Sequence, residues 1–110
     1  MTGAAVVIVL AGLLIVWLAI RSWQGRLSRN YIAGVRTPST MRSDEAFRVA
    51  NKAAAPFSLV SGLLFVVTGV VAAIVPAHTA TVVLPTGVVV AAVVVVVGGV
   101  IGVRAARALP

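Results

Sequence analysis

The residues best suited to recognition chemistry are gathered in one short polar segment, residues 34–40, with the sequence GVRTPST. Gly34 permits a positive φ or a close backbone approach, while Pro38 fixes its own φ and keeps Thr37 out of helical geometry. Arg36 lies between these constraints, and a guanidinium on a rigid loop can bind a carboxylate or phosphate through two parallel hydrogen bonds. The same pattern also fits a rigid connector whose arginine contacts lipid headgroups. The segment therefore predicts either a recognition loop or a connector at a membrane surface.

The remaining ionisable residues argue against catalysis. The chain has two acidic residues, the adjacent Asp44 and Glu45, a single histidine at position 78, and no cysteine. These few groups provide no nucleophile–base pair, no set of metal ligands and no phosphate-binding loop. We therefore predict that the protein is not an enzyme, has no catalytic residues and binds neither a metal nor a cofactor.

Most of the chain must be solvated by lipid, because 61% of its 110 residues are hydrophobic and only 10% are charged. Three apolar runs, at about residues 3–23, 57–75 and 82–103, reach the roughly 20 residues that a helix needs to cross a bilayer. Lipid favours helices because the backbone must satisfy its own hydrogen bonds. No basic residue precedes the first run, which favours a retained anchor over a cleaved signal peptide. We predict an all-α membrane protein with three transmembrane helices in a single domain, residues 1–110.

The charge distribution predicts the orientation of these helices. All nine basic residues lie between the first and second runs or after the third, and the connection at 76–81 has none. The positive-inside rule places the basic side in the cytoplasm, so the topology is N-out/C-in. This arrangement accounts for the net charge of +7 without nucleic acid as a partner, and attraction to membrane lipids follows from it. The bias toward valine, alanine and arginine is typical of GC-rich bacterial genomes and suggests a multi-pass protein of the bacterial plasma (inner) membrane.

The predicted cytoplasmic loop, residues 24–56, contains an amphipathic helix of its own. Ser43 is a suitable N-cap, and the two acidic residues that follow it suit the positive end of a helix dipole. The apolar side of this helix consists of Ala46, Phe47, Ala50, Ala53 and Ala54. We predict a helix over about 44–55 that lies in the membrane interface or docks on the bundle, before Pro56 begins the second span.

Residues 34–56, GVRTPSTMRSDEAFRVANKAAAP, resemble the signature loop of the SdpI family of bacterial membrane proteins. That pattern runs Gly-Ile-Arg-Thr-Pro-Trp-Thr-Leu, followed by serine and acidic residues, and then by tryptophan, a basic residue and histidine. The Gly-x-Arg-Thr-Pro-x-Thr core is present here, and Phe47 with Arg48 falls on the tryptophan–basic pair. Ser39 and Phe47 replace the two tryptophans, and Asn51 replaces the histidine. One apolar run before the loop and two after it match the layout of the family, so the resemblance covers nearly the whole chain.

The resemblance implies a non-enzymatic immunity or signalling protein. The best-known member protects its producer from a secreted peptide toxin and captures a transcriptional repressor at the membrane. By analogy the loop and the helix after it would contact a regulator, a toxin peptide or lipid headgroups. Arg36 would supply the binding charge, Gly34 and Pro38 would shape the loop, and Glu45 would hold an arginine in place. The predicted partner-binding residues are Gly34, Arg36, Thr37, Pro38, Thr40, Glu45, Phe47 and Arg48.

The alternative function is a small accessory subunit that packs on a larger membrane complex through its glycine and alanine faces. Gly98 and Gly102 form a G-x-x-x-G pair that lets helices approach closely, and we expect it to pack within the bundle rather than to form a dimer. A holin-like pore former is a third possibility, which the specific-looking loop does not support. No ionisable side chain lies well inside the three runs, which argues against a transporter.

Overall fold

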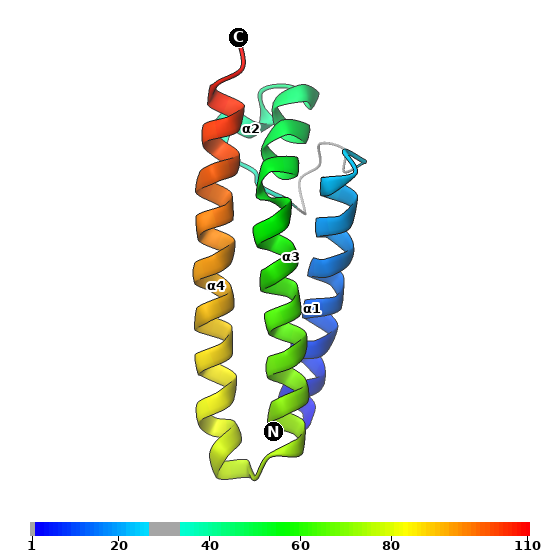
Figure 1. The fold of residues 1–110 in the computed structure, drawn as a ribbon, viewed down its shortest axis with the longest axis vertical. Helices are drawn as coiled ribbons and strands as arrows, with labels where there is room; N and C mark the ends of the chain where they lie inside the picture. Colours follow the sequence, from blue (N-terminus) through cyan, green and yellow to red (C-terminus); the bar gives the residue numbers. More distant parts are fainter. Residues whose placement is uncertain (1, 27–33) are drawn as a thin grey trace.

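Three long helices and one short one make up the fold in the computed structural model, which describes residues 2–26 and 34–110. Within those ranges the chain has no strand. The helices are α1 (Thr2–Trp23), α2 (Pro38–Met41), α3 (Asp44–Ile74) and α4 (Ala77–Arg107). The long helices are antiparallel neighbours in an elongated bundle of 53 × 20 × 19 Å, with α3 between α1 and α4 (Figure 1). All three are long and apolar enough to cross a membrane, which confirms the predicted all-α membrane fold.

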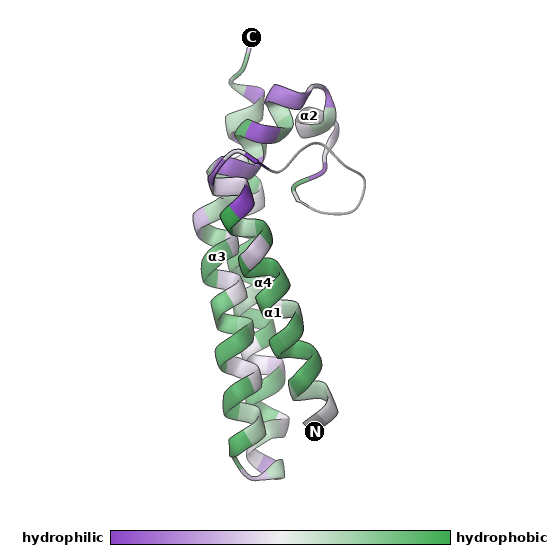
Figure 2. Ribbon diagram, turned by 90° about the vertical axis from the view of Figure 1, so that its right-hand side faces the viewer, coloured by the Kyte–Doolittle hydropathy of each residue, from purple (hydrophilic) through white to green (hydrophobic). Residues whose placement is uncertain are grey.

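The two ends of the bundle differ in chemistry. Figure 2 shows that the hydrophobic helical surface gives way to hydrophilic residues at the end that carries α2, the start of α3 and the end of α4. The N-terminus of α1 and the connection between α3 and α4 lie at the opposite end (Figure 1). The predicted N-out/C-in orientation relies on this polarity and stays a prediction.

The predicted interfacial helix and the second span form one continuous helix, α3. Ser43 caps it, because the Ser43 Oγ accepts a hydrogen bond of 3.0 Å from the Ala46 N–H. The helix then passes through Pro56, where the sequence predicted a boundary. Packing against α4 on both sides of the proline explains the continuity: a Cβ on Gly102 would lie 2.6 Å from the Ala50 carbonyl oxygen, and one on Gly98 would lie 2.6 Å from the Phe57 Cβ. The helix is therefore held against α4 across the position where proline removes a backbone donor.

The connection between the second and third spans is also shorter than the sequence suggested. Only Val75 and Pro76 separate α3 from α4, so most of the predicted polar connection at 76–81 forms the first turn of α4. Ala80 is fully buried and belongs to a cluster with Ala5 and Ala72. Burying this side chain between the other two long helices favours an early helix start over an extended polar turn.

Small residues set the distance between the helices. Besides Gly98 and Gly102 on α4, a Cβ on Gly12 of α1 would lie 2.7 Å from the carbonyl oxygen of Gly62 on α3. Glycine therefore allows direct backbone contact at both helix interfaces, as expected where lipid provides no hydrophobic force between helices. The expectation that the G-x-x-x-G pair packs within the bundle is confirmed by its contacts with α3.

Candidate functional site

The candidate site is the loop that leads into α2, together with the part of α3 beneath it. Gly34 has a φ of +96°, in the region that disfavours side chains. A Cβ at this position would lie 2.6 Å from the Asn51 Oδ1 and 3.0 Å from the Phe47 Cζ. Both the backbone geometry and the lack of space therefore require glycine. The part of the predicted loop at residues 27–33 lies outside the described residues.

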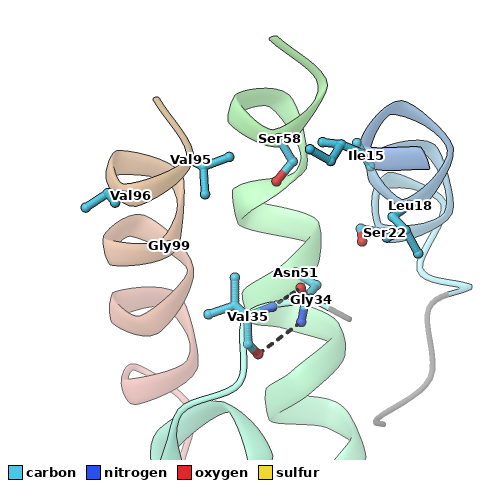
Figure 3. A pocket seen from close by; sticks show the side chains of 11 residues that line it. Ile15, Leu18, Ser22, Gly34, Val35, Asn51, Ser58, Val95, Val96 and Gly99 are labelled. Atoms are coloured by element: carbon cyan, nitrogen blue, oxygen red, sulfur yellow. Dashed lines mark hydrogen bonds between the residues drawn. The ribbon is translucent and has the colours of Figure 1, made fainter. Parts of the chain in front are cut away.

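Asn51, on α3, holds the loop through side-chain hydrogen bonds. Its Oδ1 accepts a hydrogen bond of 2.7 Å from the Val35 N–H, and its Nδ2 donates to the Phe47 carbonyl at 2.9 Å. The Nδ2 also lies 3.5 Å from the Val35 carbonyl, as the dashed lines in Figure 3 show. Asn51 is only 4% exposed, so its amide serves this contact and not solvent. Sequence reasoning recorded Asn51 only as the replacement of a histidine and missed its position under the loop.

The two threonines of the segment are used within the loop. Thr37 is the N-cap of α2: its Oγ1 accepts from the Thr40 N–H at 3.3 Å, and the Thr37 N–H donates to the Thr40 Oγ1 at 2.7 Å. Thr40 also donates from its hydroxyl to the Val35 carbonyl at 2.9 Å and is fully buried. Pro38 occupies the first helical position, where its missing N–H and fixed φ suit the helix start. The cap and the proline fix the backbone after Arg36, and the Thr40 hydroxyl holds the Val35 carbonyl before it.

Two arginines join α2 to the end of α4. The Arg42 guanidinium donates through Nη2 to the Ala106 carbonyl at 2.7 Å and through Nε to the Ser39 carbonyl at 3.2 Å. The Arg107 Nε donates to the Ser39 Oγ at 3.2 Å. Carbonyls in the last turn of a helix lack intrahelical partners, and a cation there is also favoured by the helix dipole. Sequence reasoning missed this contact, because Arg42 and Ala106 are 64 positions apart in the chain and leave no local signal.

The predicted site residues fall into two groups. Thr40 and Phe47 are completely buried and support the loop, and Thr37 is partly buried. The exposed members are Gly34, Arg36, Pro38, Glu45 and Arg48. Arg48 lies beside the turn after α1, since its Cδ is 3.5 Å from where a Cβ on Gly25 would be. The structure thus brings the loop and Phe47 together, and it leaves Arg36 on the exposed side.

A hollow of about 410 Å³ lies directly below the loop. Its walls come from all three long helices and from Gly34 and Val35 (Figure 3). Ser22, Asn51 and Ser58 are the polar residues among them, and the others are mostly valine, leucine and isoleucine. No buried side-chain nitrogen or oxygen in residues 2–26 and 34–110 lacks a hydrogen-bond partner. The buried polar side chains of the site therefore find their hydrogen-bond partners within the protein. They support a loop that carries exposed charge above a mostly apolar hollow.

Comparison with known families gives one match, in which residues 26–103 fit the SdpI/YfhL protein family. The matched region includes the loop, α2, α3 and most of α4, and it covers most of the chain. No curated protein and no solved structure matches the chain.

Proposed function

Because this chain belongs to the SdpI/YfhL protein family and is a multi-pass membrane protein, we propose that it acts as a non-enzymatic immunity or signalling protein. In this proposal it resides in the bacterial plasma membrane and binds a regulator or a peptide through the exposed side of residues 34–48. One observation carries the proposal. The Arg36 side chain is exposed, while hydrogen bonds from Asn51 and Thr40 to Val35 fix the backbone beside it.

A fixed backbone favours recognition because less conformational freedom is lost on binding. Three contacts immobilise the loop: the Asn51 amide holds Val35, the Thr40 hydroxyl holds the same residue, and the Thr37 cap fixes the start of α2. None of these groups needs solvent or a partner to complete its hydrogen bonds. The loop can therefore present Arg36 without an ordering step.

The chemistry of the exposed side suits an acidic group on the partner. Arg36 and Arg48 are both exposed cations, and a guanidinium binds carboxylate or phosphate with two directed hydrogen bonds. The first turn of α3 adds two exposed acids, Asp44 and Glu45, which would select for a basic group at a neighbouring position. A partner segment that carries both an acidic and a basic residue would match this pattern.

A binding role is better supported than catalysis by the placement of the titratable groups. The two acidic residues are exposed neighbours at the start of α3, and His78 lies in the first turn of α4 at the other end of the bundle. A general acid–base pair needs its members within hydrogen-bond reach of one reacting group. The positions of Asp44, Glu45 and His78 do not provide such an acid–base pair.

The test is purification of the tagged full chain from its native membranes in mild detergent, followed by mass spectrometry. We expect Arg36→Gln to lose a near-stoichiometric regulator or peptide that the wild-type protein retains. Arg26→Gln is the matched control, because Arg26 is an exposed arginine outside residues 34–48. Normal recovery of the partner by an Arg36→Gln protein that inserts normally would contradict the proposal. Co-purification of a large membrane complex by both variants would instead identify an accessory subunit.

A further inference from the structure

Two hollows lie next to each other along α4, and together they are named the crevice. The hollow below the loop, of about 410 Å³, and a second one of about 470 Å³ between the loop and the end of α4 share Val35, Val96 and Gly99 as lining residues. The crevice reaches from Val95 to Arg107, which corresponds to about 18 Å at 1.5 Å per helical residue. It is therefore an elongated space that runs from the apolar part of α4 to its basic end.

Most of the residues that line the hollow below the loop are apolar and belong to the predicted spans. Val95 of α4 and Ile15 of α1 both point toward the part of α3 that carries Ser58, while Val96 points away from it (Figure 3). A Cβ on Gly99 would meet no atom within 4 Å, so the glycine leaves this wall open. Lipid acyl chains surround the spans in a bilayer, so an apolar space that is open between the spans can accommodate one.

The outer end of the crevice is cationic. Arg104 and Arg107 line the second hollow together with Thr37. The Arg107 guanidinium is held at the rim by its hydrogen bond to the Ser39 Oγ. Two neighbouring guanidinium groups, one of them held in place, suit a phosphate, which accepts paired hydrogen bonds from arginine.

The helix dipole does not cancel this attraction. The C-terminal end of a helix carries roughly half a negative charge, whereas the two arginines carry two full positive charges. Arg42 in addition covers the Ala106 carbonyl with its own guanidinium. The electrostatic balance at the rim therefore favours an anion.

We propose that the crevice between α1 and α4 binds one anionic phospholipid, with an acyl chain against Gly99 and its phosphate at Arg104 and Arg107. This site is separate from the exposed side of the loop, so it goes beyond the proposed partner binding. The lipid would pack directly beneath Val35 and thereby support the loop from the membrane side.

The first test fills the crevice. Gly99→Leu places a side chain in the open wall, and Gly3→Leu is the matched control, because a Cβ on Gly3 also meets nothing within 4 Å and Gly3 lines neither hollow. Native mass spectrometry of the full chain in detergent, with added phosphatidylglycerol or phosphatidylcholine of equal chain length, counts the lipids retained. We expect one phosphatidylglycerol on the wild type and on Gly3→Leu, and at least a tenfold weaker affinity for Gly99→Leu. Circular dichroism checks helicity, and Gly99→Ala replaces the leucine variant if that variant does not insert.

The second test removes the charge at the rim. Arg104→Gln/Arg107→Gln should reduce the preference for phosphatidylglycerol over phosphatidylcholine by about tenfold, as expected for two cations near an anionic headgroup. Arg26→Gln/Lys52→Gln removes the same charge at exposed positions outside both hollows and should leave the preference unchanged.

Three outcomes would overturn the lipid site. These are equal retention of the two lipids by the wild type, undiminished retention by the crevice-filling variant, and displacement of the lipid by glycerol phosphate at the same concentration. The last result would mean that the headgroup alone is recognised. Loss of a protein partner by Arg36→Gln is measured separately, so failure of the lipid site and failure of the partner site give different results.

Discussion

The loop end and the membrane-spanning part of this protein are held together by different forces. At the loop end, polar side chains reach the backbone of distant segments, as Asn51 does at Val35 and Arg42 does at Ala106. Between the long helices the contacts are mainly direct approaches of backbone over glycine, as at Gly12 and Gly102. The difference follows from the surroundings: lipid removes the hydrophobic drive for helix association, so close packing replaces it, while the polar end must satisfy an irregular backbone.

This comparison predicts which substitutions are costly. In the spans, a larger side chain at a helix contact should lower the stability of the bundle, and the loss of a polar group should change it little. At the loop end, the loss of a polar group should open the loop locally and leave the spans folded.

The largest effect is expected from added volume at the α3–α4 interface. Gly102→Leu would push a side chain against the Ala50 backbone, where a Cβ already lies 2.6 Å from the carbonyl oxygen. Overpacking of this kind costs about 3 kcal/mol when only backbone can move away. Thermal unfolding followed by circular dichroism in detergent measures it. Gly99→Leu is the control on the same helix, because Gly99 faces open space, and it should leave the melting temperature nearly unchanged. An equal fall in melting temperature for the two variants would refute close packing at Gly102 as the cause.

The second effect tests the polar anchor of the loop. Asn51→Ala removes the acceptor for the Val35 N–H and the donor to the Phe47 carbonyl. The Phe47 carbonyl keeps its backbone partner within α3, so the Val35 N–H is the group that loses its acceptor. An unsatisfied buried backbone group costs about 1–3 kcal/mol, so we expect the loop to open locally while the spans stay folded. Hydrogen exchange of the amides at 34–41 should accelerate, while the exchange in α1 and α4 stays slow.

Lys52→Ala is the control for Asn51→Ala, since it changes the adjacent, exposed side chain. Unchanged exchange at Val35 in Asn51→Ala would show that the loop is held by other contacts. Global unfolding of the variant would instead show that the two regions of the molecule are not separable.

The extent to which the sequence predicts these two regions also differs. Hydropathy alone identifies the three spans, because the lipid requirement acts on every residue of a long run. The continuity of α3 through Pro56 is not predictable from local rules, since proline favours a boundary and only the contacts of Gly98 and Gly102 show why the helix continues.

The structure of the loop depends even more on contacts that local sequence rules do not predict. Ser43 as the cap of α3 follows from local sequence, and so does the fixed backbone at Pro38. The anchor at Asn51 depends on a contact across 16 residues, and the one at Arg42 on a contact across 64. The helical pattern places Phe47 on the apolar side of the predicted helix, but it does not show that the loop at Gly34 covers this side, and both Phe47 and Arg48 are predicted to contact a partner. The burial of Phe47 depends on where the loop returns onto α3.

The third effect concerns the contact between α2 and the end of α4. Arg42→Ala removes the guanidinium from the Ala106 and Ser39 carbonyls. Because Arg42 is exposed, water can replace part of this contact, and we expect the stability of the contact between α2 and α4 to fall by about 1 kcal/mol. Arg42→Lys keeps the charge without the planar fork and should recover only part of the loss. Hydrogen exchange at residues 104–109 reports the effect, and full recovery by lysine would show that charge alone is needed.

The smallest effect is expected from the polar contact deepest in the spans. The Ser61 hydroxyl is fully buried and donates to the Ala91 carbonyl on α4 at 3.0 Å. Ser61→Ala removes this donor, but the Ala91 carbonyl keeps its intrahelical partner, so no group is left unsatisfied. Hydrogen bonds between membrane helices contribute about 0.6 kcal/mol on average. Unfolding of Ser61→Ala and of the control Ser58→Ala in detergent should therefore differ by less than 1 kcal/mol. A loss as large as that of Gly102→Leu would mean that polar contacts, and not close packing, hold α3 to α4.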